Sequence, residues 1–265
     1  MSLLISSHDT DVCDSTSPLG FETAGGGSWP KWHRYLTLDG KRAYEIGNVC
    51  STCIFFFERM EGANKKVEVD DLVDCLAKGL TADDRTTVQK LSTMLPTGRY
   101  RANFIEFTPV AVELGTHDDY FVNEQQAVWG LDGFWGLPHN PKIPYYRAGT
   151  RAISSTQRLF EFVLPMYPRN WLNSERVAQY RAMLDEGSKP TAVSLSVLDV
   201  KGAAVPDTDE FEHWCLAHYV LDGHHKIEAA ALAGKPITML SFVTHDNGVS
   251  TPEEVAQLGT LLDFR

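Results

Sequence analysis

The stretch Tyr219-Val220-Leu221-Asp222-Gly223-His224-His225-Lys226 carries the strongest structural signal in this chain of 265 residues. A run of apolar residues that is typical of a strand stops before Asp222-Gly223, and several alanines follow a few residues later. The sequence therefore predicts a strand over 214–221 and a helix over 224–233. The first turn of a helix has backbone N–H groups without helical partners and the positive end of the helix dipole. This turn is thus predicted to bind an anion such as phosphate.

The side chains of the turn allow two interpretations. His225 and Lys226 could donate hydrogen bonds to a bound phosphate, which would offset the electrostatic cost of cations in the first turn of a helix. Asp222 could shape the turn through its own side chain or contact a metal ion. The alternative is an ordinary strand-to-helix turn with a solvent-exposed His-His-Lys sequence, and the residues alone leave it open.

Regular elements flank the turn on both sides. A strand is predicted over 159–164, followed by a helix over 175–186 that Asn173-Ser174 caps and Gly187 ends. Alternation of Val and Leu with Ser predicts a half-buried strand over 192–198. A last strand is expected over 237–243, and a short helix over 252–262. The C-terminal part therefore runs strand, helix, strand, strand, helix, strand.

This order of elements, together with the Gly-containing turn and its basic residues, resembles the ParB/sulfiredoxin-like domain over about residues 159–245. The nearest variant is the Asp-Gly-His-His-Arg form of free-serine-kinase-like and uncharacterised ParB-like proteins. This chain has Lys226 in place of the arginine, which removes a bidentate donor but keeps a phosphate-binding cation. His224 stands where sulfiredoxins carry a reactive cysteine, so the resemblance does not extend to that chemistry.

The resemblance implies a nucleotide- or phosphate-binding protein that could act as an ATP- or ADP-dependent small-molecule phosphotransferase, or as a nucleotide hydrolase, with Mg²⁺. The implied phosphate-binding residues are Asp222, Gly223, His224, His225 and Lys226, and the implied catalytic residues are Glu175, as base, and His225. Glu175 would equally suit a helix N-terminus through the dipole. A non-catalytic ligand-binding or interaction module is one alternative. A nucleotide-switched partition-like protein is another, but the chain after residue 245 is too short for a helix-turn-helix segment.

The N-terminal half has weaker patterns. Residues 1–30 are rich in Ser, Thr, Asp and Gly, which predicts a flexible arm, either a mobile tail or an extended segment. Residues 31–150 are expected to form a mixed α/β region of unknown role, and residues 151–265 the ParB/sulfiredoxin-like domain. Within the middle region we expect strands in 35–58 and 101–114, helices over 69–78 and 81–95, and an irregular aromatic loop over 129–150. The expected fold class is α+β.

Cys50 and Cys53 have the spacing of half a tetrahedral zinc site. A complete site needs two more ligands, and the chain has no second Cys-x-x-Cys pair. Redox chemistry usually places such a pair at the start of a helix, whereas the residues after Cys53 are typical of a strand. Zinc binding, redox chemistry and two ordinary buried thiols all remain open.

The charge balance argues against non-specific nucleic-acid binding. Acidic residues outnumber basic ones by 35 to 24, for a net charge of −11, whereas each phosphate contact needs a Lys or Arg. No segment approaches the ~20 apolar residues of a membrane-spanning helix, and the N-terminus lacks the pattern of a signal sequence. The sequence predicts a cytoplasmic protein with a small-molecule or nucleotide ligand and no nucleic-acid or membrane partner, and it leaves the oligomeric state open.

Overall fold

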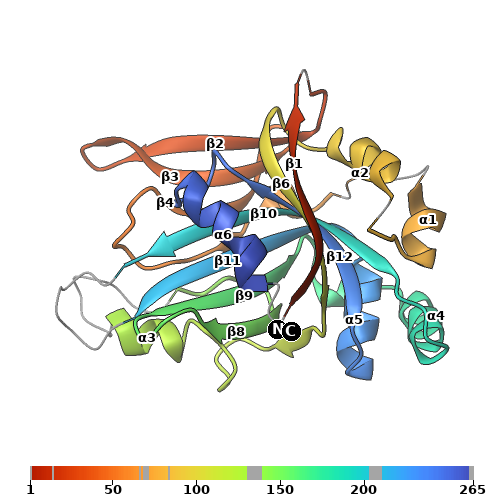
Figure 1. Cartoon of the computed structure of the whole chain (residues 1–265). Helices are drawn as coiled ribbons and strands as arrows, with labels where there is room; N and C mark the ends of the chain where they lie inside the picture. The colour runs from red at the N-terminus through yellow and green to blue at the C-terminus, as the bar shows by residue number, and fades with distance from the viewer. Residues whose placement is uncertain are drawn as a thin grey trace.

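The computed structural model describes residues 2–13, 15–65, 67, 72–82, 84–129, 139–202 and 211–262. Within these residues the protein has a mixed α+β fold that contains two β-sheets (Figure 1). The predicted fold class is therefore confirmed at this level.

The larger sheet joins eight of the described strands in the order β1-β6-β12-β10-β11-β9-β8-β7. Their bounds are β1 Leu3–Val12, β6 Gly98–Phe107, β7 Val110–Val112, β8 Tyr145–Ala152, β9 Gln157–Pro165, β10 Thr191–Lys201, β11 Glu212–Asp222 and β12 Ile237–Thr244. β9 runs parallel to β11, and β10 runs parallel to β12. The other neighbouring strands are antiparallel.

The smaller sheet is antiparallel and has the order β2-β3-β4-β5. Its strands are β2 Leu19–Gly26, β3 Trp29–Leu38, β4 Lys41–Asn48 and β5 Glu58–Arg59. Asp39 and Gly40, with φ of 50° and 70°, connect β3 to β4. Two positive φ angles in a two-residue connection match the twist of a hairpin, so this turn sets the register of β3 on β4.

Helices cover the sheets. They are α1 Val73–Lys78, α2 Arg85–Ser92, α3 Glu124–Trp129, α4 Ser174–Asp185, α5 His224–Ala233 and α6 Pro252–Leu262, with short 3₁₀ turns at Glu61–Ala63 and Arg169–Trp171. Figure 1 shows α4 and α5 next to each other at one end of the larger sheet, and these two helices also contact each other along their length.

Two hydrophobic cores lie on opposite faces of the larger sheet. One core packs its Leu195 and Phe162 against the smaller sheet, α1 and α2. The other packs Leu198 and Leu216 against α4, α5 and α6. Burial on both faces makes the centre of this sheet the most protected part of the molecule.

The C-terminal elements agree closely with the sequence prediction. The helix over 224–233 and the strands of 214–221 and 237–243 are present, as are the Asn173 cap and the helix that ends at Leu262. The prediction of a half-buried strand over 192–198 is wrong, because β10 is buried on both faces. The serine side chains of β10 can be buried because they keep hydrogen-bond partners: Ser196 hydrogen-bonds to His218 and to Ser241.

Several N-terminal predictions need correction. Of the two forms expected for residues 1–30, a mobile tail or an extended segment, residues 3–12 take the extended one, because they form β1, an edge strand paired with β6. The loop expected over 129–150 contains β8, and residues 130–138 of that loop lie outside the described residues. The helix expected over 81–95 begins at Arg85, and of the helix expected over 69–78 the described part is α1.

The larger sheet contains strands from both sides of the domain boundary predicted near residue 150. It combines β1, β6, β7 and β8 with the four C-terminal strands β9 to β12. Because β12 pairs with both β6 and β10, the two halves share one hydrogen-bonded sheet. No helix in the described part of the chain is long and apolar enough to cross a bilayer.

Candidate functional site

The turn between β11 and α5 depends on Gly223. This residue has φ of 102° and ψ of 15°, which is the left-handed region that a side chain disfavours. A Cβ atom at Gly223 would lie 2.7 Å from the Cβ of Ala192 on β10. The backbone of the turn can therefore approach β10 only because residue 223 is glycine, and this close approach fixes where α5 begins.

Lys226 is buried beneath the turn. Its Nζ donates hydrogen bonds to the carbonyl oxygen of Thr191 at 2.9 Å and to Asp222 Oδ2 at 2.7 Å. Burial lowers the pKa of Lys226, while the nearby carboxylate of Asp222 acts in the opposite direction. These bonds account for two of the three donors of the ammonium group, so Lys226 mainly braces the turn against β10.

His224 is also buried and ties the turn to the chain that follows β9. Its Nε2 accepts a hydrogen bond from the backbone N–H of Met166 at 3.0 Å. The ring stacks on Tyr167, with 3.9 Å between the ring centroids. Because Nε2 accepts, this bond requires the tautomer that carries its proton on Nδ1, and protonation of Nε2 would break the bond.

His225 makes the corresponding link to α4. Its Nε2 accepts from the backbone N–H of Asn173 at 3.0 Å, and the Asn173 side chain in turn accepts from the N–H of Arg176. Asn173 is the N-cap of α4. The two histidines therefore bind the segment before α4 to the start of α5, a role that the sequence prediction of phosphate donors did not include.

A small pocket of about 80 Å³ opens at this turn. It is lined by Val67, Tyr167, Arg176, Tyr180, Leu221, Asp222, Gly223, His224, His225 and Lys226. The five residues predicted to bind phosphate thus all line one pocket, together with a cation, Arg176, that sequence analysis missed. The only sequence signal for Arg176 was its position three residues after a helix cap.

Glu175, the predicted base, does not line this pocket. It is an exposed carboxylate in the first turn of α4, where it suits the helix dipole. Its neighbour Arg176 contributes to the pocket instead. The second catalytic candidate, His225, does line the pocket.

A partly buried ion pair lies one helical turn further along α5. Arg169 Nε and Nη2 donate to the two carboxylate oxygens of Glu228 at 3.0 and 2.8 Å, and the Tyr146 hydroxyl donates to the same carboxylate at 2.6 Å. Burial, followed by this hydrogen bond to Glu228, raises the pKa of Tyr146. A satisfied carboxylate of this kind fixes the 3₁₀ turn after β9 on α5.

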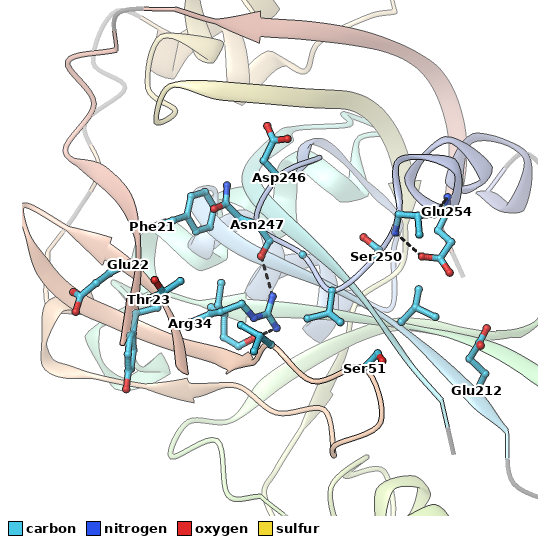
Figure 2. Close-up of a pocket in the computed structure, with 17 residues that line it drawn as sticks. Phe21, Glu22, Thr23, Arg34, Ser51, Glu212, Asp246, Asn247, Ser250 and Glu254 are labelled. Atoms are coloured by element: carbon cyan, nitrogen blue, oxygen red, sulfur yellow. Dashed lines mark hydrogen bonds between the residues drawn. The ribbon is translucent and has the colours of Figure 1, made fainter. Parts of the chain in front are cut away.

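A larger pocket lies elsewhere, between the smaller sheet and the loop after β12 (Figure 2). Its volume is about 570 Å³, which is within the range of small-molecule sites. Arg34 at its base is fully engaged, since it forms a bidentate pair with Asp199 at 3.0 and 2.5 Å and donates to the carbonyl of Asn247 at 2.9 Å. Figure 2 shows the Arg34 guanidinium pointing toward Asn247.

This larger pocket has the wrong charge for phosphate. Four carboxylates, Glu22, Glu212, Asp246 and Glu254, line it against the single cation Arg34. Glu212 begins β11 and Asp222 ends it, so the two pockets lie at opposite ends of that strand, roughly 33 Å apart at ~3.3 Å per residue. The pocket at the start of α5 is therefore a separate site.

Cys50 and Cys53 lie on the loop after β4, and both thiols are free and half-buried. Within the described part of the chain, no group of three or more Cys, His, Asp or Glu side chains is arranged to hold a metal ion. Residues 203–210, which precede β11 and include several acidic residues, lie outside the part of the chain that the structure describes. The geometry here gives no support to a zinc site at the two cysteines.

Comparisons with protein-family models, with curated proteins and with solved structures find no significant match to this chain. The function is therefore inferred from the geometry of the chain's own residues.

Proposed function

We propose that this protein binds the phosphate group of a small molecule in the pocket at the start of α5. The observation that carries this proposal is the position of Arg176, an exposed cation that lines the same pocket as Gly223, His224 and His225 at the start of α5. A helix N-terminus with an adjacent arginine is a favourable environment for an oxyanion.

The charges of the pocket support an anion. Asp222 is already neutralised by Lys226, so Arg176 and the dipole of α5 leave the site positive in a protein whose net charge is −11. The first turn of α5 contains no acidic residue. An anion would also relieve the unfavourable placement of Lys226 at the positive end of a helix.

The size of the pocket limits what it encloses. About 80 Å³ is far below the ~300–1,000 Å³ of typical small-molecule sites, so the pocket suits one phosphate group and not a whole nucleotide. A nucleotide would place a terminal phosphate here and extend its base over the surface of α4. The proposed ligand class is thus a phosphorylated small molecule or a nucleotide with Mg²⁺, in line with the resemblance to ParB/sulfiredoxin-like domains.

The test is a binding titration with inorganic phosphate, ADP and ATP, each with and without Mg²⁺, read by calorimetry and by thermal melting. A ligand at ~100 times its dissociation constant should stabilise the protein by about 2.7 kcal/mol. Arg176→Ala should weaken binding roughly tenfold, because a hydrogen bond to a charged group contributes ~1.5–3 kcal/mol. The matched control is Arg181→Ala on the same helix, since Arg181 lines a different cavity and should leave binding unchanged.

Phosphoryl transfer is a separate step of this proposal. Turnover of ATP or ADP that Glu175→Gln abolishes, with binding intact, would support a phosphotransferase in which Glu175 reaches the ligand from outside the pocket. Binding without turnover would support a non-catalytic module. If phosphate, ADP and ATP all leave the melting temperature unchanged, the turn is structural and the proposal is wrong.

A further inference from the structure

The loop that carries Cys50 and Cys53 is held in place by polar contacts on several sides. Asn48 Oδ1 accepts from the N–H of Cys50 at 3.1 Å, and the N–H of Gly202 donates to the carbonyl of Ser51 at 2.8 Å. Trp129 Nε1 donates to the carbonyl of Thr52 at 3.3 Å. The backbone around the two thiols is thus preorganised, as a reactive site requires.

A buried cation lies directly beneath this loop. Lys201 is fully buried, and its Nζ donates to the carbonyl of Cys50 and to the side-chain oxygen of Asn48. Burial lowers the pKa of Lys201, and the neighbouring Asp199 carboxylate acts in the opposite direction. A cation close to a pair of thiols favours the thiolate over the thiol.

The two thiols have unequal environments. Burial alone would raise the pKa of Cys50, but hydrogen bonds from the Cys53 thiol and from the hydroxyl and N–H of Thr52 outweigh it and lower that pKa to about 7. Burial, followed by the hydrogen bond to Cys50, raises the pKa of Cys53 to about 12. The Thr52 hydroxyl lies 3.3 Å from the Cys50 sulfur. Such an asymmetry separates an attacking thiolate from a protonated partner.

We propose that Cys50 and Cys53 form a redox-active dithiol, in which Cys50 is the attacking thiolate and Cys53 the resolving thiol. Three observations carry this inference: the Cys-x-x-Cys spacing of two half-buried thiols on one loop, the Thr52 hydroxyl at 3.3 Å from the Cys50 sulfur, and the Lys201 ammonium beneath the loop. The inference does not rest on phosphate binding, because the loop lies apart from the start of α5 and no residue is shared by the two sites.

The reaction is thiol–disulfide exchange with a low-molecular-weight disulfide as oxidant. The Cys50 thiolate attacks one sulfur of that disulfide, the S–S bond breaks, and one small thiolate leaves and takes up a proton. Cys53 then loses its proton and attacks the Cys50 sulfur of the mixed disulfide, which releases the second small thiol. The protein gives up two electrons and two protons, and the oxidant is reduced to two thiols.

The first experiment measures alkylation of the reduced full-length protein by iodoacetamide, with peptide mass spectrometry to follow each cysteine. Cys13, an exposed thiol outside the loop, is the internal reference. At pH 7 the larger thiolate fraction of Cys50 outweighs its lower intrinsic nucleophilicity. Cys50 should therefore react roughly threefold faster than an ordinary exposed thiol.

The second experiment treats the protein with oxidised glutathione. The peptide that spans both cysteines should lose two hydrogens, Cys53→Ser should accumulate one glutathione on Cys50, and Cys50→Ser should do neither. A thermal melt of each variant confirms that it is folded. Alkylation of Cys50 no faster than that of Cys13, or a glutathione adduct on wild-type Cys50 that Cys53 never displaces, overturns the proposal.

Discussion

Lys226 Nζ lies 2.7 Å from Asp222 Oδ2, across one turn of chain, so the cation of the Asp-Gly-His-His-Lys sequence is paired with the acid of the same sequence. The sequence indicates a phosphate donor at position 226, whereas the structure gives the ammonium a second role as a brace for the carbonyl of Thr191. The exposed positive charge at this site comes from Arg176 on the neighbouring helix. The two helices therefore have to be correctly docked before Arg176 and the turn can form one pocket.

Replacing Gly223 should disturb both the turn and the helix that follows it. Gly223→Ala adds a Cβ at φ of 102° and within 2.7 Å of Ala192. The left-handed backbone should cost ~1–2 kcal/mol, and the overpacking against β10 a further ~1–3 kcal/mol. Urea denaturation should show a free energy of unfolding lower by the sum of these effects.

Gly187→Ala is the matched control for this change. Gly187 ends α4 with φ of 91°, but an added Cβ would meet no atom within 4 Å. The free energy of unfolding of Gly187→Ala should therefore fall only by the cost of the left-handed backbone, ~1–2 kcal/mol. Equal destabilisation of the two variants would mean that Gly223 makes no close approach to β10.

The buried pair of Arg34 and Asp199 should be essential for the contact between the two sheets. Asp199→Asn leaves the Arg34 guanidinium buried without its charge partner, and removing one member of a buried pair costs ~3–5 kcal/mol. The loss should appear as a lower midpoint of urea denaturation.

An exposed ion pair provides the comparison. Lys65 pairs with Asp39 on the surface, where both side chains are about half exposed. Lys65→Gln should change the free energy of unfolding by at most ~1 kcal/mol. If Asp199→Asn lowers the free energy of unfolding by as little as Lys65→Gln does, the structural role given to the buried pair is wrong.

Two buried histidines should make the protein sensitive to mild acid. Burial lowers the pKa of both His213 and His218 to about 3, whereas an unfolded histidine titrates near 6.5. The unfolded state therefore binds more protons between these values, and the free energy of unfolding falls as the pH is lowered through that window. Between pH 7 and pH 5 each histidine should contribute a loss of about 2 kcal/mol.

Urea denaturation at the two pH values measures this loss. His218→Gln should reduce the difference in the free energy of unfolding between pH 7 and pH 5 by about 2 kcal/mol, because one proton-binding group is removed. His117→Gln is the control, since the His117 side chain is 89% exposed. This variant should show the same difference in the free energy of unfolding between the two pH values as the wild type. An unchanged difference in His218→Gln would mean that His218 titrates normally in the folded protein.

The C-terminal elements could be predicted because their signals are local. Asn173 caps α4 from within three residues, and Gly223 and Gly234 mark the two ends of α5 through their own positive φ angles. The residues predicted to bind phosphate line one pocket because the sequence places them in a single turn. Such features need no knowledge of distant parts of the chain.

Three features that escaped prediction depend on distant partners. β1 is polar from Ser6 to Asp11, and its partner strand β6 lies about ninety residues later in the chain. Arg176 joins the pocket only after α4 docks on α5, and Ser196 on β10 is buried with partners from other strands, His218 on β11 and Ser241 on β12. Periodicity within one segment cannot reveal contacts of this kind.

The position of β12 has a consequence for the order in which the chain can fold. β12, at Ile237–Thr244, is inserted between β6 and β10, so it is the only strand that joins the pair β1–β6 to the rest of the larger sheet among the described residues. During synthesis both β6 and β10 are made before β12. Until then β6 and β10 each present an unpaired edge, which is a site for incorrect strand pairing. Completion of the larger sheet thus depends on a strand that is made after both of its neighbours in the sheet.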